Sequence, residues 1–172
     1  MHRLILALLL LLAACNSAPR KADLTGQYRD PRIPIYSAAV FDQSRFAAGD
    51  WDQVAAFLPG PAENCADTGL HFPEKADAAR GTYRLCLSGA MREGGGSVAW
   101  QQGGRFALPG IDEPLWVLWV DADYRTVLIG TPSGRLGFIL NRGSALPADR
   151  LTAARDIFAF NGYDLTMLVL LR

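Results

Sequence analysis

The chain has 172 residues, half of them hydrophobic, and no internal repeat, which is enough for one domain with a substantial core. Seventeen basic residues balance seventeen acidic ones. This balance argues against a strongly charged binding surface, so neither nucleic acid nor an acidic polymer is expected as a partner.

Residues 1–14 have the composition of a secretory signal peptide. His2 and Arg3 precede an apolar run, and small residues come just before Cys15. The run is too short to span a bilayer as a permanent helix. Leu-Ala-Ala-Cys at 12–15 resembles a bacterial lipobox, which implies a lipid on Cys15. The alternative is an ordinary signal peptide with an incidental cysteine.

Residues 15–37 are predicted to be the lipidated cysteine and a tether, followed by a barrel domain at 38–172. The segment is polar and contains three prolines, a composition typical of linkers. Several acyl chains on Cys15 would hold the protein firmly on a membrane. Asn16, unlike an aspartate there, gives no hint of inner-membrane retention. We therefore expect the bacterial outer membrane, with the domain facing the periplasm.

A short helical turn and a strand are predicted over residues 41–57. The spacing of Phe41 and Phe46 suits one helical turn, and Gly49 lies where this turn gives way to the strand. From residue 51 onward the side chains alternate with a period of two. The residues placed on one face of this strand are Trp51, Gln53, Ala55 and Phe57.

Further short strands are predicted at 63–72, 81–90 and 97–108, with the glycine-rich stretch 93–96 as a hairpin connection. Residues 115–120 are apolar on both faces, which predicts a strand covered on both sides. Turns at 121–123 and 131–134 lead to strands at 125–130 and 135–142. Regularly spaced short strands with glycine turns predict a sandwich or a barrel.

The period changes to that of a helix over residues 147–160. Leu151, Ala154 and Phe158 fall on one side, and Asn161-Gly162 provides a stop. We expect this helix to pack outside the sheet, against the strand at 115–120. A final aliphatic strand is predicted at 164–171.

Two cysteines remain in the exported domain after Cys15. A disulfide between Cys65 and Cys86 is the default expectation in an oxidising compartment. The alternative is two buried free thiols. Only His71 remains after signal cleavage, so neither a metal site nor a metal cofactor is expected.

Four ordered motifs resemble the lipocalin family, and in particular the bacterial outer-membrane lipoprotein lipocalins. They are F-D-x-x-R-F with G-x-W at 41–51, Asp-Ala-Asp-Tyr-Arg at 121–125, the strand ending in Asn-Arg at 136–142, and Gly-Tyr-Asp at 162–164. The resemblance implies an all-β, antiparallel up-and-down barrel with one C-terminal α-helix packed outside. It also implies a set of structural residues at one barrel end: Gly49, Trp51, Asp121, Tyr124 and Arg142.

The resemblance also implies a function, which is to bind, store or carry a small hydrophobic ligand such as a fatty acid or a lysophospholipid. An eight-stranded barrel is just wide enough to hold one such molecule. The predicted ligand-binding wall consists of Gln53, Ala55, Phe57, Tyr83, Leu85, Trp100, Phe106 and Phe138. For each of these residues, plain core packing is the alternative.

The sequence departs from the lipocalin pattern between residues 108 and 115, where the family fits another strand. Either the barrel is one strand short, or Gln102-Gly103-Gly104-Arg105 is a hairpin turn that divides 97–108 into two short strands. A shortened barrel could be filled by side chains and hold no ligand. The second function hypothesis is therefore an envelope protein-binding module, similar to a small-barrel protease inhibitor. A purely structural role in the envelope is a third.

Enzyme activity is not expected. Asp121 and Asp123 are paired carboxylates, but they lie in a predicted turn, where acidic residues are common. No catalytic residue is predicted. The sequence does not indicate the oligomeric state.

Overall fold

The computed structural model describes residues 27–63, 65–74 and 77–171. Its strands are β1 (Trp51–Phe57), β2 (Gly69–His71), β3 (Arg80–Leu87), β4 (Ala90–Ser97), β5 (Ala99–Gln101), β6 (Arg105–Ala107), β7 (Leu115–Val120), β8 (Thr126–Gly130), β9 (Gly137–Asn141) and β10 (Leu168–Leu170). Its helices are α2 (Gln43–Phe46), α3 (Ala148–Phe160) and the 3-10 turn η1 (Leu165–Met167). The predicted signal peptide and Cys15 lie outside the described residues.

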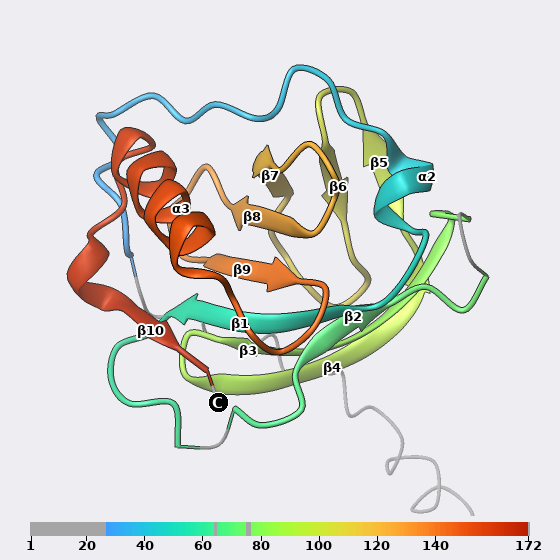
Figure 1. The fold of residues 1–172 in the computed structure, drawn as a ribbon, viewed down its shortest axis with the longest axis horizontal. Helices are drawn as coiled ribbons and strands as arrows, with labels where there is room; N and C mark the ends of the chain where they lie inside the picture. The colour runs from blue at the N-terminus through green and yellow to red at the C-terminus, as the bar shows by residue number, and fades with distance from the viewer. Residues whose placement is uncertain (1–26, 64, 75–76, 172) are drawn as a thin grey trace, which may run out of the picture.

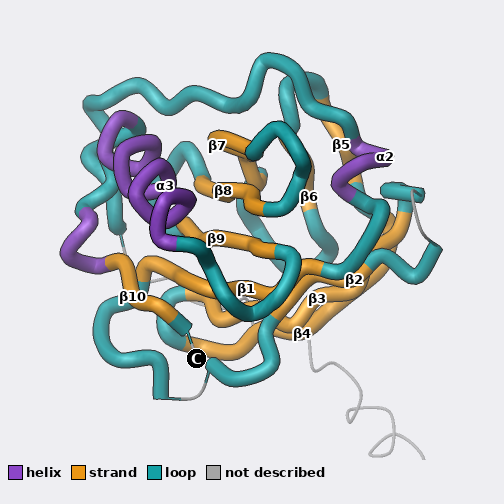
Figure 2. Tube along the Cα trace, viewed as in Figure 1, coloured by secondary structure: helices purple, strands orange, loops and turns teal. Residues whose placement is uncertain are grey.

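Nine strands form a nearly closed antiparallel barrel in the order β4-β3-β2-β1-β9-β8-β7-β6-β5, and β10 pairs with the second half of β1 (Figures 1 and 2). The two ends of this order, β4 and β5, are joined by Val98 alone. Chain continuity therefore closes the barrel where strand pairing does not. The predicted all-β barrel with one C-terminal helix outside is confirmed.

The barrel has not lost a strand between residues 108 and 115. A turn at 102–104 separates β5 from β6, and Gly103 and Gly104 have φ angles of 71° and 66°. Such left-handed angles favour glycine. Of the two alternatives, the hairpin turn is correct.

The predicted hairpin connection at 93–96 is wrong, because Gly94, Gly95 and Gly96 lie within β4 and pair with β3. The turn is instead at Ser88-Gly89, which have φ angles of 51° and 80°. A two-residue hairpin loop of type I′ needs positive φ at both positions, and this pair supplies it.

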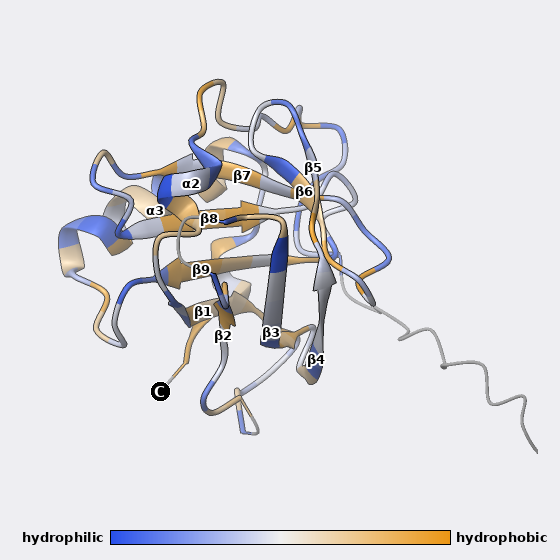
Figure 3. Ribbon diagram, turned by 90° about the vertical axis from the view of Figure 1, so that its right-hand side faces the viewer, coloured by the Kyte–Doolittle hydropathy of each residue, from blue (hydrophilic) through white to orange (hydrophobic). Residues whose placement is uncertain are grey.

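Helix α3 covers the outside of the barrel and creates a second core (Figure 1). Its Phe158 lies 4.9 Å from Phe57, measured between ring centroids, and Ala154 is buried in the same cluster. Strands β7, β8 and β9 are strongly hydrophobic along their length (Figure 3) because they face the interior on one side and this outer cluster on the other. The prediction that residues 115–120 are covered on both faces is confirmed, because one face of β7 contacts the interior core and the other contacts the outer core.

A β-bulge in β1 decides which of its side chains face the interior. The pairing of β1 with β9 shifts register between Gln53 and Ala55. As a result Trp51 and Ala56 belong to the interior cluster, whereas Ala55 and Phe57 belong to the outer cluster beneath α3. The predicted inward position of Ala55 and Phe57 is wrong, since one extra residue reverses the alternation.

The described part of the predicted tether, residues 27–37, packs on the barrel. Tyr28 N–H donates to the carbonyl of Gly134 at 2.7 Å, and the Arg29 guanidinium binds the carbonyls of Pro132 and Asn161 at 2.7 and 3.0 Å. The segment then passes α3 and reaches α2 (Figure 1). In this part of the chain the prediction of a separate tether is wrong. No helix among the described residues is long and apolar enough to cross a membrane.

Candidate functional site

One end of the barrel, here called the closed end, is sealed around Trp51 at the start of β1. The indole stacks on Phe46 at 5.1 Å, and its Nε1–H donates to the Phe46 carbonyl at 2.8 Å. The Arg142 guanidinium carbon lies 4.3 Å from the indole centroid, and Arg142 Nε–H donates to the Tyr124 carbonyl at 2.7 Å. Burial lowers the pKa of Arg142. A side chain at Gly49 would collide with this guanidinium.

The β7–β8 turn at the closed end is held by Asp121. Its Oδ1 accepts the backbone N–H groups of Arg125 and Thr126 at 2.5 and 2.6 Å. Burial acts to raise the pKa of Asp121, but these hydrogen bonds outweigh it and lower the pKa below its usual value. Tyr124 has a left-handed φ of 57°, and its hydroxyl accepts the Asp42 N–H at 2.6 Å. The structure thus brings together the five residues predicted for the barrel end.

The interior of the barrel is the candidate binding region. Of the predicted wall residues, Tyr83, Leu85, Phe106 and Phe138 are buried in the interior cluster, and Trp100 packs against it. The Trp100 indole lies 4.8 Å from the Phe106 ring and donates to the Ala78 carbonyl at 2.7 Å. These five residues line one continuous apolar core. Their contact with a ligand stays a prediction.

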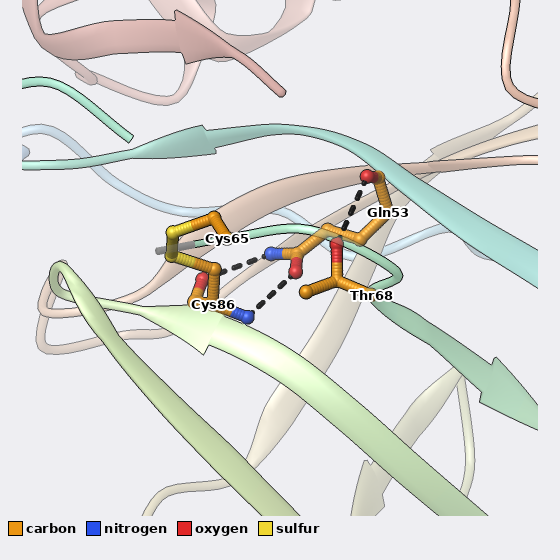
Figure 4. Close-up of a disulfide and its surroundings, with 4 residues drawn as sticks. All are labelled: Gln53, Cys65, Thr68 and Cys86. Atoms are coloured by element: carbon orange, nitrogen blue, oxygen red, sulfur yellow. Dashed lines mark hydrogen bonds between the residues drawn. A yellow bond between two sulfur atoms is a disulfide. The ribbon is translucent and has the colours of Figure 1, made fainter. Parts of the chain in front are cut away.

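Gln53 also faces the interior, but both ends of its amide are occupied (Figure 4). Its Oε1 accepts the N–H of Cys86 at 2.7 Å, and its Nε2 donates to the carbonyl of Cys86 at 3.0 Å. Cys86 is bonded to Cys65, which confirms the predicted disulfide. The side chain of Gln53 therefore replaces a strand segment between β1 and β3, where β2 is too short to reach.

The opposite, open end is closed over by the loop 108–114. Leu108 and Ile111 of this loop are buried in the interior cluster, and Tyr83 donates its hydroxyl to the Pro109 carbonyl at 2.8 Å. The Glu113 carboxylate accepts a hydrogen bond from the Ser133 hydroxyl, and it lies 3.6 Å from an Arg135 nitrogen. Access to the interior from this end requires the loop to move.

A buried tyrosine braces the β8–β9 turn beside this loop. The Tyr163 hydroxyl accepts the Thr131 N–H at 2.9 Å and donates to the Leu136 carbonyl at 2.7 Å. Burial raises the pKa of Tyr163 to about 12, so the phenol stays neutral at physiological pH. These hydrogen bonds hold the turn at 131–136 in place, and Glu113 of the loop 108–114 contacts this turn through Ser133.

The outer surface also has two grooves, of about 670 and about 360 Å³. The larger is lined in part by Asp52, Asp67 and Leu171, and the smaller contains His71 beside Asp50. Both contain outward-facing positions of β1 and β2. Among residues 27–63, 65–74 and 77–171, no cluster of histidine, cysteine and acidic side chains could hold a metal ion.

Arg92 is an inward-facing residue that the sequence analysis missed. The glycines that follow it indicated a turn, and this hid the alternation of β4. Its cross-strand partner is the interior residue Leu85. The sequence does contain the correct signal, since Ser88-Gly89 suits a hairpin turn better than residues 93–96 do. A turn at Ser88-Gly89 places Arg92 on the strand that follows.

Comparisons with known proteins agree on the fold. The structure resembles the cockroach allergen Per a 4, with a TM-score of 0.56, 10% identity, and coverage of 79% of this chain and 90% of that one. It also resembles insecticyanin from the tobacco hornworm Manduca sexta, with a TM-score of 0.57, 16% identity, and coverage of 85% and 86%. No curated protein sequence matches significantly. A family model described as "Lipocalin-like domain" matches residues 41–171, and the chain therefore belongs to the lipocalin-like family.

Proposed function

We propose that this protein is a lipid-anchored lipocalin of the bacterial envelope that binds one fatty acid or lysophospholipid inside its barrel and carries it. Lipocalins are generally binding or transport proteins for small hydrophobic molecules and not enzymes, so the family supports the class of function. The observation that carries the proposal is the continuous apolar interior, sealed by Trp51 and Arg142 at one end and covered at the other only by a loop.

The path of the N-terminal segment supports the anchoring part of the proposal. Gln27 and Tyr28 bind the carbonyls of Ser133 and Gly134, so the described chain begins at the open end. Eleven residues separate Cys15 from Gln27, and such a segment spans at most about 40 Å. A lipid on Cys15 would therefore keep the open end close to the bilayer, where single-chain lipids are found.

The ligand test uses a chain that begins at Asn16, which keeps every residue that the structure describes. Native mass spectrometry in the presence of hexadecanoate or palmitoyl-lysophosphatidylcholine should show one ligand per chain. Phe138→Leu should change the affinity, since Phe138 lies in the interior. Phe57→Leu is the matched control, because Phe57 is equally buried, at 1% exposure, but lies in the outer core.

The anchoring test is separate. The wild-type protein should fractionate with membranes, and its intact mass should correspond to a chain that starts at Cys15 and carries acyl groups. Cys15→Ala should abolish both results. A wild-type protein cleaved at another position, without added mass, would refute the lipoprotein assignment.

A protein-binding module with a filled interior is the second candidate. The observation that favours it is the close packing of the interior rings, with Phe46 lying 5.9 and 6.1 Å from Trp100 and Phe106. In that case neither lipid would bind in the mass-spectrometric test. The same experiment therefore decides between the two functions.

A further inference from the structure

Arg92 projects from the inner face of β4 into the barrel. Its neighbour Glu93 forms an ion pair with Arg84 at 2.9 Å on the outer face, where both side chains are exposed. Successive side chains of a strand point to opposite faces. Arg92 stands opposite Leu85, which is 1% exposed and belongs to the interior cluster. Among the described strand residues, no other charged side chain is paired with an interior residue.

The guanidinium of Arg92 has an unmet hydrogen-bonding requirement. Its Nε is buried and has no hydrogen-bond partner among the described residues, and no described carboxylate lies within ion-pair distance. Arg92 is half-buried, and a buried nitrogen without a hydrogen-bond partner is costly. Glu113, a buried acidic residue at this end, accepts a hydrogen bond from the Ser133 hydroxyl and pairs with Arg135.

Beyond Arg92, the inner face of β4 carries no bulky side chain of its own. The next inward positions of β4 are Gly94 and Gly96, which pair with Tyr83 and Gly81 of β3. A Cβ at Gly94 would lie 2.6 Å from the Tyr83 hydroxyl, so the tyrosine reaches over the glycine. The positive charge of Arg92 acts on this phenol against the effect of burial, which raises the pKa of Tyr83. Arg92 and Tyr83 lie on one wall, because Gly94, over which Tyr83 reaches, is the next inward position after Arg92.

Arg92 is also placed correctly along the barrel for a head group. It is the third residue of β4, which begins immediately after the Ser88-Gly89 turn. That turn lies at the open end, where Ser88 binds the Arg135 carbonyl. A lipid with its tail among the interior residues would therefore bring its polar end towards Arg92.

We propose that Arg92 binds the anionic head group, carboxylate or phosphate, of a single-chain lipid whose tail occupies the barrel interior. This inference rests on the proposed function and adds the charge of the ligand to it. A guanidinium forms paired hydrogen bonds to either anion. The Tyr83 hydroxyl lies on the same wall, over Gly94, and donates to the Pro109 carbonyl.

The test compares anionic lipids with uncharged lipids of the same chain, all below their critical micelle concentrations. Equilibrium binding is measured for hexadecanoate against hexadecanol, and for palmitoyl-lysophosphatidate against monopalmitoylglycerol. Because hydrogen bonds to charged groups are strong, the wild type should prefer an anion by roughly tenfold or more. The pair that shows the preference identifies carboxylate or phosphate as the head group.

Arg92→Met keeps the length of the side chain and removes the charge. It should abolish the preference for the anion while leaving the affinity for the uncharged lipid within about twofold. Arg84→Met is the matched control, since it removes an arginine from the outer face of the adjacent strand. It should leave the preference for the anion intact.

The outcomes separate this inference from the proposed function. If the wild type binds the uncharged and anionic lipids equally, or if Arg92→Met keeps the preference, Arg92 is not the head-group residue and the lipid-binding function stands. If the wild type binds none of the four lipids, both the function and the inference are wrong.

Discussion

Replacing Gln53 by leucine tests the most specific polar contact in the barrel. Gln53 is 4% exposed and Cys86 is fully buried, so the two hydrogen bonds between them are shielded from water. Leucine is similar in size but leaves the N–H and the carbonyl of Cys86 without partners. Each unsatisfied buried group costs about 1–3 kcal/mol. We expect Gln53→Leu to lower the free energy of unfolding by about 2–6 kcal/mol.

The assay is urea unfolding followed by tryptophan fluorescence, with the disulfide kept oxidised in both proteins. Gln101→Leu is the control, because Gln101 is exposed on β5 and its substitution should change stability by no more than about 0.5 kcal/mol. If Gln53→Leu unfolds at the same urea concentration and with the same slope as wild type, the amide does not replace a strand segment between β1 and β3.

Three further perturbations test the barrel. Trp51→Ala should lower the free energy of unfolding by about 3–5 kcal/mol in urea, because the indole fills the closed end; an unchanged midpoint would contradict its role there. Hydrogen bonds lower the pKa of Asp121, so its ionised form stabilises the fold above about pH 4, and this contribution disappears as the pH falls through the lowered value. Stability measured from pH 7 to 3 should therefore fall less in Asp121→Asn than in wild type. Replacing both Cys65 and Cys86 by alanine should cost about 3 kcal/mol, as estimated for a loop of this size, and a double variant as stable as wild type would show that the disulfide contributes nothing.

The features that the sequence predicted correctly depend on local patterns. The two-faced apolar strand and the helix that covers it follow from hydrophobic period alone, and Ala154 and Phe158 are buried as that period requires. The hairpin turn at 102–104 follows from its two glycines. In each case the residues that carry the signal are also the residues that form the element.

The errors arose where distant residues decide the structure. Val54, Ala55 and Ala56 are all small and apolar, so the sequence contains no signal for the bulge that turns Ala55 and Phe57 outward. The bulge keeps β1 paired with β9 while Ala55 and Phe57 face the cluster beneath α3. Similarly, the glycines of β4 are not turn residues. They leave room for the Tyr83 ring, which comes from the neighbouring strand.

The inner face of β4 contributes unusually little to stability. Its four positions hold Ala90, Arg92, Gly94 and Gly96, none of which is a large apolar residue. Burying one such side chain contributes about 1.5–3 kcal/mol. Proteins often sacrifice stability at binding sites. Packing of the Tyr83 ring accounts for Gly94, whereas a ligand site accounts for Arg92.

This trade-off predicts that Arg92→Met stabilises the unliganded protein. The substitution removes a buried nitrogen that lacks a partner and keeps an apolar side chain of similar length, so the free energy of unfolding should rise by about 1 kcal/mol. Urea unfolding without lipid measures the change, and Arg84→Met on the outer face should stay within about 0.5 kcal/mol of wild type. A less stable Arg92→Met protein would mean that the guanidinium is satisfied within the fold, and the wall would then be structural and not a binding surface.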